Sequence, residues 1–227
     1  MGESSKYNFS IPDNPGGTHG LVLSHVDRGD FVLECGCASG YMTEYMKKIL
    51  YCTVHVVEID EECCERAKQW ATDWYCGDLN KDEWKRYYQT SACSYNKILF
   101  ADVLEHLTDP LKTLKNAVKL LRKDGKVVIS IPNICHNDIL IRMYYDCWQY
   151  RSLGLLDNTH IHFWGVSNIE SFLNDAGLRV ESIEAVAIKT QETEQRLPFH
   201  VDEELLNLLK KRPYGEVYQW VVVGVKK

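Results

Sequence analysis

The sequence predicts an α/β fold in which helices cover both faces of a doubly wound sheet of seven strands. Three observations support this fold. Apolar runs of strand length alternate along the chain with helical patterns, as they do in βαβ units. The runs are continuous, which is typical of parallel strands that are buried on both faces. A loop of small residues also follows the first run, at 36–40, where such folds place ligands.

The elements follow in order along the chain. Strands are expected near residues 31–35, 53–58, 73–76, 97–101, 127–131, 179–188 and 217–226. Helical patterns lie near residues 18–26, 40–50, 61–71, 106–122, 138–150, 166–176 and 202–211. Pro132 ends the fifth strand, because proline cannot donate to a sheet, and Gly177 suits the end of a helix.

The chain of 227 residues is long enough for one well-buried domain and short for two. We therefore expect a single domain over 1–227. Two insertions interrupt the alternating pattern, at about 134–165 and 189–216. Both follow the carboxyl ends of strands, where α/β folds bind ligands, so we expect them to wall a binding site.

Composition excludes several classes of protein. The net charge of −6 and the pI near 5.8 argue against a nucleic-acid partner. The nine cysteines form no paired Cys-x-x-Cys motifs, so a structural zinc site is not expected. The sequence shows no signal peptide and no run of membrane-spanning length. We expect a reduced, soluble, cytoplasmic protein with no membrane partner.

The loop after the first strand indicates a nucleoside site. Gly36, Ala38 and Gly40 would let a ligand approach backbone N–H groups at a helix N-terminus. Glu58 ends the second strand, where a carboxylate can accept both hydroxyls of a ribose. A tight turn without a ligand would explain the loop alone, and the position of Glu58 favours the cofactor.

The spacing of this loop differs from the Gly-x-Gly-x-x-Gly dinucleotide fingerprint, because Tyr41 follows Gly40 directly. It resembles the Gly-x-Gly-x-Gly loop of class I S-adenosylmethionine-dependent methyltransferases, with Ala38 as the middle residue. The resemblance implies a Rossmann-like sheet with an antiparallel last strand. It also implies S-adenosylmethionine as cofactor and S-adenosylhomocysteine as product.

Two more segments carry the resemblance, which covers about residues 19–180. Asp102–Leu107 (Asp-Val-Leu-Glu-His-Leu) resembles a motif of small-molecule O-methyltransferases, including those of ubiquinone biosynthesis. Leu156–Phe163 resembles the Leu-Asp-x-Thr-His-x-x-Phe segment of methyltransferases that tailor sugars and secondary metabolites. His162 is a departure, because the family more often has a permanently charged basic residue there.

The resemblance implies a set of cofactor contacts at the ends of the first four strands. Asp78 would bond the adenine amine and Leu79 would pack against the ring, although Gly-Asp is also ordinary turn chemistry. The expected cofactor-binding residues are Glu34, Gly36, Ala38, Gly40, Glu58, Ile59, Asp78, Leu79, Asp102 and Val103.

Methyl transfer from a sulfonium is an in-line displacement, so the protein supplies mainly alignment in a dry site. A hydroxyl acceptor also needs a base, and His106 and His160 are the candidates. Each histidine could instead have a structural role. A carboxylate acceptor needs only a cation or hydrogen-bond donors. The aromatic segment 142–151 and His162 supply the expected acceptor-binding residues, namely Arg142, Tyr145, Trp148 and His162.

A metal site is the alternative role for the motif Asp102–Leu107. If a helix began near Asp102, then Asp102, Glu105 and His106 would share one side of it and could hold a divalent cation. Some ubiquinone-pathway relatives use a comparable trio. Asp102 is expected to face the cofactor instead, and acids are favoured at a helix start in any case. We therefore expect no metal.

The leading prediction is O-methylation in natural-product tailoring. The acceptor would be a sugar or secondary-metabolite hydroxyl, or a carboxylate on a peptide or small molecule. Small-molecule, glycan and peptide acceptors stay open, as does the oligomeric state. Two other functions remain as alternatives: an S-adenosylmethionine-binding partner protein without catalysis, and an NAD-type oxidoreductase. The second is disfavoured by the loop spacing and by the lack of a second domain.

Overall fold

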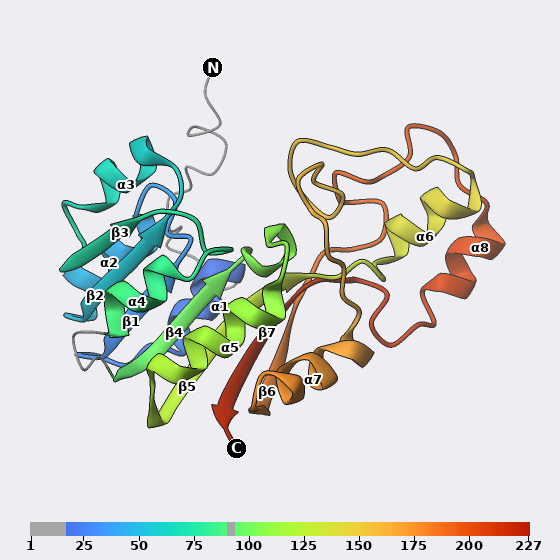
Figure 1. The fold of residues 1–227 in the computed structure, drawn as a ribbon. Coiled ribbons are helices and arrows are strands. Elements are labelled where there is room, and N and C mark those ends of the chain that lie inside the picture. The colour runs from blue at the N-terminus through green and yellow to red at the C-terminus, as the bar shows by residue number, and fades with distance from the viewer. Residues whose placement is uncertain (1–16, 90–93) are drawn as a thin grey trace.

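Seven strands pair into one sheet in the order β3-β2-β1-β4-β5-β7-β6 (Figure 1). The computed structural model describes residues 17–89 and 94–227. The strands are β1 (Phe31–Cys35), β2 (Thr53–Glu58), β3 (Asp73–Cys76), β4 (Tyr95–Ala101), β5 (Leu121–Pro132), β6 (Leu178–Ala187) and β7 (Val217–Lys226). The first five strands pair in parallel, and β7 is antiparallel to both β5 and β6. The predicted fold class is confirmed, including the antiparallel last strand.

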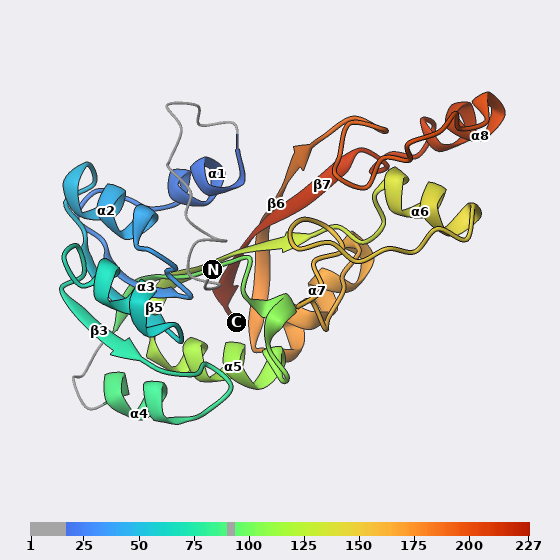
Figure 2. The same cartoon turned by 90° about the horizontal axis from the view of Figure 1, so that it is seen from above.

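Helices lie on both faces of the sheet (Figure 2). They are α1 (Thr18–Ser24), α2 (Tyr41–Lys48), α3 (Glu61–Ala67), α4 (Glu83–Gln89), α5 (Pro110–Leu120), α6 (Asn137–Tyr144), α7 (Val166–Asp175) and α8 (Glu203–Leu209). One apolar cluster joins α1, α2 and α3 to one face of the sheet. The larger cluster joins α4, α5 and α7 to the other face.

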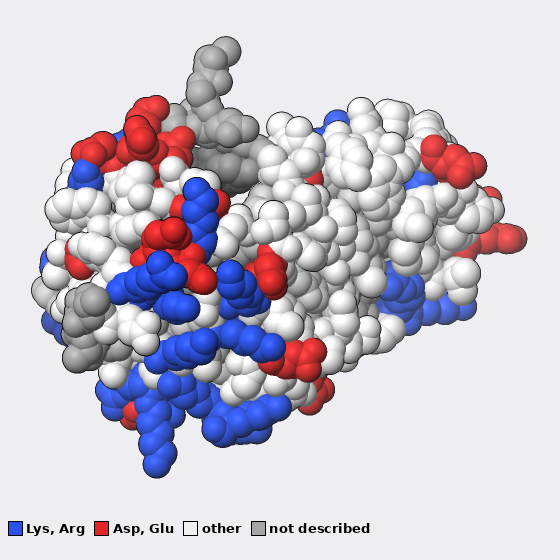
Figure 3. Space-filling view, viewed as in Figure 1, with Lys and Arg blue, Asp and Glu red and all other residues white. Residues whose placement is uncertain are grey.

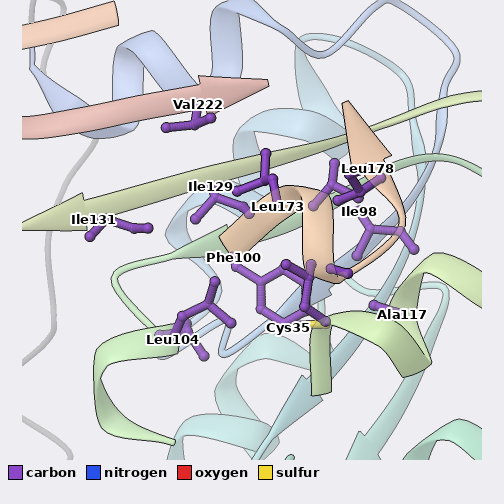
Figure 4. Packing of buried hydrophobic residues seen from close by; sticks show 14 of the residues in the cluster. Cys35, Ile98, Phe100, Leu104, Ala117, Ile129, Ile131, Leu173, Leu178 and Val222 are labelled. Carbon is purple, nitrogen blue, oxygen red and sulfur yellow. The ribbon is translucent and has the colours of Figure 1, made fainter. Parts of the chain in front are cut away.

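The larger cluster shows why these apolar runs form the interior. Phe100 of β4 and Ile129 of β5 are completely buried, and they pack with Ala117 of α5 and Leu173 of α7 (Figure 4). Full burial of one such large side chain stabilises the fold by roughly 1.5–3 kcal/mol. The strands that carry the site are therefore held by packing on both faces.

The structure corrects the predicted bounds of several helices, among them the one expected at 61–71, which ends at Ala67. The helix expected at 106–122 begins at Pro110, because Asp109 caps it by accepting from Lys112 N and proline suits the first helical turn. Only a short 3-10 helix, Leu104–His106, precedes it. The helix expected at 138–150 ends at Tyr144. Asp146, just beyond it, is left-handed with φ of 52°.

One helix and half of one strand were missing from the prediction. α4 has only seven residues, too few for a clear helical period. It is anchored by Trp84, whose indole N–H donates to Leu79 O at 3.1 Å. β5 begins at Leu121 rather than at 127, because its first residue already pairs with Tyr95 of β4.

The two insertions lie together at the carboxyl ends of β5 and β6. α6 and α8 are neighbours there (Figures 1 and 2), and a small apolar cluster joins Ile141 of α6 to Leu209 of α8. The predicted insertions therefore form one lobe beside the strand ends. Their assignment to a single domain over 1–227 stays a prediction.

Two further findings bear on the chemistry of the chain. Within 17–89 and 94–227, every cysteine is a free thiol. Over the same residues, no helix has both the length and the apolar character needed to cross a bilayer.

Candidate active site

The loop between β1 and α2 has an unusual backbone. Gly36, Ala38 and Gly40 have φ of 75°, 47° and 83°, a left-handed conformation that is costly for residues other than glycine. A Cβ at Gly36 would lie 2.6 Å from Val103 Cγ2, and one at Gly40 would lie 2.8 Å from Ala67 Cα. Both glycines are therefore required by conformation and by close packing.

We expect Gly40→Ala to destabilise the protein by about 3 kcal/mol, since the left-handed penalty adds to the clash with α3. Denaturant unfolding followed by circular dichroism measures the change. Ala38→Gly is the matched control, because it relieves strain at the same loop, and we expect a change within about 1 kcal/mol. Wild-type stability of Gly40→Ala would contradict the close approach of α2 to α3.

Glu58 holds this loop in place. The residue is 8% exposed. Oε2 accepts from Ala38 N at 2.8 Å, and Oε1 accepts from Ile59 N at 2.8 Å and Asp60 N at 3.0 Å. A carboxylate has about four acceptor positions. Three of these positions are filled, so the group can order the loop and still accept a hydrogen bond from a ribose hydroxyl at Oε2.

Glu34 lies beneath the same loop with one oxygen unsatisfied. Oε2 accepts from Thr43 Oγ1 at 2.6 Å, whereas Oε1 is buried without a hydrogen-bond partner in the described part of the chain. Burial, and then the charge of Glu58, raise the pKa of Glu34 to about 8. A buried acceptor in this state is suited to a cationic group brought by a ligand.

This raised pKa predicts a pH dependence of stability. Folding favours the protonated Glu34, so its contribution is complete below the usual pKa near 4.5 and is lost as the pH rises toward about 8. We expect Glu34→Gln, which stays neutral, to gain stability relative to wild type over this range, by at most about 1.4 kcal/mol per pH unit. Urea unfolding at pH 5 and pH 8 measures the difference. A constant difference would contradict the burial argument.

The ends of β2 and β3 present an apolar and acidic edge. Ile59 is 64% exposed, an unusual position for a large apolar side chain, and Leu79 is nearly buried. Asp78 accepts from Asn80 N and Asn80 Nδ2, both at 2.9 Å, so the ordinary strand-end turn is also present. The expected adenine contacts stay a prediction, and these side chains lie where the sequence placed them.

The Asp102 carboxylate bonds residues that the metal alternative did not include. Its φ is 55°, and Oδ1 accepts from Ser130 Oγ and Gln219 Nε2, both at 2.7 Å. Oδ2 lies 3.9 Å from His19 Nε2, and His19 in turn contacts the Tyr41 hydroxyl at 3.1 Å. The three partners of Asp102 come from β5, β7 and α1, and none of them was visible in the sequence.

The alternative trio of Asp102, Glu105 and His106 is therefore wrong. The α-helix begins only at Pro110, and the Asp102 carboxylate faces β5 and β7. The group that does assemble is Glu105, His106 and His160, with one donor atom from each residue within 4.8 Å of the others. The two histidines predicted as candidate bases thus lie side by side, with ring centroids 4.7 Å apart.

A hydrogen-bond chain determines the tautomer of His106. Thr159 Oγ1 lies 2.6 Å from Asp157 Oδ1 and 3.0 Å from His106 Nδ1. An ionised carboxylate can only accept, so the threonine hydroxyl donates to Asp157 and must accept from Nδ1–H. The neutral imidazole then carries its proton on Nδ1. Nε2 is the proton acceptor of the ring.

Glu105 and His160 form a buried pair in which burial disfavours charge on both groups. The Glu105 carboxyl is 1% exposed, and its Oε1 lies 4.0 Å from His160 Nε2. Burial, and then the charge of Asp102, raise the pKa of Glu105 well above its usual value. Burial and the neighbouring His106 lower the pKa of His160 to about 4. His160 is therefore a neutral neighbour and a weaker base than an ordinary histidine.

Residues 21–183 match the methyltransferase domain family. The chain belongs to this family. The match confirms the predicted resemblance to class I S-adenosylmethionine-dependent methyltransferases, and its range agrees with the predicted coverage of 19–180.

Relatives and solved structures agree with this membership. A ubiquinone biosynthesis O-methyltransferase of Coxiella burnetii is 24% identical over 168 residues, which are 70% of this chain and 68% of that protein. A SAM-dependent methyltransferase of Archaeoglobus fulgidus has a TM-score of 0.64 at 17% identity, covering 91% of this chain and 90% of its own. Magnesium protoporphyrin IX methyltransferase of Synechocystis, with bound SAH, has a TM-score of 0.59 at 13% identity, covering 92% and 80%. At these identities the structures establish the shared fold.

The four acceptor residues expected in this methyltransferase do not form one site. The Arg142 guanidinium donates to three backbone carbonyls in the insertion lobe. The Tyr145 hydroxyl accepts from Asp202 N at 3.1 Å, and His162 Nε2 lies 3.4 Å from Thr108 O. Trp148 is 44% exposed and lines a cavity together with Arg142. Roles in acceptor binding stay predictions, and the structure favours Trp148.

Proposed function

We propose that this methyltransferase transfers the methyl group of S-adenosylmethionine to a hydroxyl oxygen of a small-molecule acceptor, with S-adenosylhomocysteine as the second product. The observation that carries the proposal is the chain from Asp157 through Thr159 to His106. It holds an imidazole in the tautomer that a general base requires, directly after β4. A protein that only bound the cofactor would not need this arrangement.

The residues of the loop fit the cofactor. Glu58 offers an acceptor for a ribose, and the missing Cβ at Gly36 brings the backbone close to the end of β4. The unsatisfied Oε1 of Glu34 suits the ammonium group of the methionine part. When bound, S-adenosylmethionine supplies an activated sulfonium methyl group, so the chain has to provide alignment and proton transfer.

In this mechanism His106 accepts the proton of the acceptor hydroxyl at Nε2 as the oxygen forms its bond to the methyl carbon and the carbon–sulfur bond breaks. Thr159 and Asp157 stabilise the imidazolium that results, because the proton on Nδ1 keeps its acceptor. Glu105 and His160, buried where charge is disfavoured, keep water and competing charge away from the ring.

Two alternative chemistries use the same residues. A carboxylate acceptor would need no base, and the ordered tautomer of His106 favours a hydroxyl. Glu105, His106 and His160 together also have the donor set of a divalent-cation site. A cation there would lower the pKa of the acceptor hydroxyl in place of a base.

Calorimetric titration with S-adenosylmethionine, S-adenosylhomocysteine and NADH, in EDTA and then in magnesium, tests the cofactor. We expect the first two to bind in EDTA and NADH not to bind. A screen for transfer of a labelled methyl group to alcohols, sugars, phenols and carboxylic acids follows. Binding of NADH alone would overturn the proposal, whereas transfer only to carboxylic acids, or only with magnesium, would favour the corresponding alternative.

A further inference from the structure

The insertion lobe contains an open cavity of about 1080 Å³, at the upper end of the usual size of small-molecule sites. Its lining comes only from residues 142–151 and 191–199, so it is built by the two insertions. The residues that matter for its chemistry are Arg142, Trp148, Arg151, Glu194, Arg196 and Phe199.

The cavity carries an excess of positive charge. Three arginines line it against one acid, Glu194. The Glu194 carboxylate is already engaged, because it accepts from Leu155 N at 2.8 Å and from the Tyr218 hydroxyl at 3.0 Å. Within 17–89 and 94–227, no carboxylate forms an ion pair with any of the three arginines.

Arg142 and Arg151 show how this charge is held. Arg142 is 2% exposed and donates to Gln195 O at 2.6 Å, Cys147 O at 3.0 Å and Arg196 O at 3.2 Å. These carbonyls accept from three of its five N–H groups, and its nearest acids, Asp138 and Glu194, act on its charge without an ion pair. Burial, and then the charge of Arg151, lower the pKa of Arg142. Arg151 Nε is itself buried with no hydrogen-bond partner in the described chain.

Two exposed aromatic side chains complete the cavity. Trp148 is 44% exposed and Phe199 is 48% exposed, which is unusual for such large apolar groups. Guanidinium groups bind carboxylates and phosphates through two parallel hydrogen bonds, and aromatic faces bind the flat or apolar part of a ligand. Guanidinium groups and aromatic side chains both line this cavity.

We propose that this cavity binds a small organic anion, a carboxylate or phosphate on an aromatic or aliphatic body. The acidic group would bind Arg151 and Arg196, and the body would lie against Trp148 and Phe199. Arg142 would attract the anion through its charge and would not bond it directly, since its N–H groups already bond the backbone of the insertion.

The cavity is connected to the candidate base by one short segment. Arg151 N donates to Leu156 O at 2.8 Å, and Asn158 N donates to Arg151 O at 2.9 Å. The next residue, Thr159, bonds His106. A ligand on the Arg151 side chain would therefore order the strand-like pairing that positions the base.

Surface lysines on α4 and α5 provide a contrast. Lys and Arg side chains gather over these helices (Figure 3), but they have acids beside them, as where Lys112 lies 3.4 Å from Asp82. They form an ordinary solvated face. Lys119 of this face is a suitable control for loss of one positive charge.

Calorimetric titration with phenyl phosphate, benzoate and the uncharged benzyl alcohol tests the cavity. We expect the two anions to bind, benzyl alcohol not to bind, and Arg151→Gln and Arg196→Gln each to weaken binding by about tenfold. Lys119→Gln should bind as wild type does. Equal binding of benzyl alcohol, wild-type affinity in both arginine variants, or no binding of either anion would overturn the proposal.

The titration needs no methyl acceptor, so a negative titration would contradict this proposal without contradicting the proposed transfer reaction. Rate measurements with an acidic and an uncharged methyl acceptor then distinguish whether the bound anion is part of the acceptor or a separate effector. If the anion is part of the acceptor, Arg151→Gln raises KM for the acidic acceptor alone. If it is a separate effector, phenyl phosphate changes the rate with both acceptors, and Arg151→Gln removes that change.

Discussion

Glu58→Ala is expected to weaken S-adenosylmethionine binding by about 100-fold or more. Hydrogen bonds to a charged group contribute roughly 1.5–3 kcal/mol each, and the ribose hydroxyl at Oε2 would lose its acceptor. The backbone N–H groups of Ala38, Ile59 and Asp60 would lose their acceptor as well, so the loop would also be less well ordered before binding. Calorimetric titration measures the affinity directly.

Glu61→Gln is the matched control for this prediction. Glu61 is an exposed acid at the start of α3, close to Glu58 in sequence and outside the loop network, and we expect unchanged affinity. Circular dichroism establishes that both variants are folded. Wild-type affinity of a folded Glu58→Ala protein would show that the ribose lies elsewhere and would overturn our map of the cofactor site.

His106→Gln is expected to lower kcat by about 10²–10⁴ while leaving cofactor affinity unchanged, because a general base contributes a factor of this order. The glutamine amide N–H can still donate to Thr159 Oγ1, so the segment that carries His160 keeps its position. Transfer of a labelled methyl group to the hydroxyl acceptor found in the screen measures the rate. Titration with S-adenosylhomocysteine measures binding.

Two companion variants sharpen this prediction. Thr159→Val removes the acceptor for His106 Nδ1–H, and we expect a smaller loss together with a shifted pH profile, since the tautomer is no longer fixed. His25→Gln, at a histidine that bonds Glu184 instead, serves as a control with an unchanged rate. A His106→Gln rate close to wild type would exclude His106 as the base and leave alignment alone to explain the reaction.

The loop and its acid could be predicted because their signal is local. Gly36 to Gly40 follow one strand, Glu58 ends the next, and parallel pairing of those two strands brings them to one edge. The surroundings of Asp102 could not be found in this way. His19, Ser130 and Gln219 come from three distant parts of the chain. None of them belongs to a motif, and only the order of strands in the sheet brings them together.

The contact between His106 and His160 could not be predicted from the sequence either. His106 and His160 were each singled out from separate motifs, but their contact depends on the path of the insertion after β5. Asp109 and Pro110 were visible signs that the helix begins late, and that start leaves Glu105 and His106 in a short turn. Their third partner is thus His160 rather than Asp102.

The position of β7 has a consequence for biosynthesis. β7 lies between β5 and β6 although both precede it in the sequence, and its Gln219 donates to Asp102. A chain emerging from the ribosome would hold β5 and β6 with open edges until the last of the seven strands appears. Open strand edges invite pairing with other chains. The site can therefore be completed only after translation has passed Gln219, and until then chaperone protection of these edges would matter most.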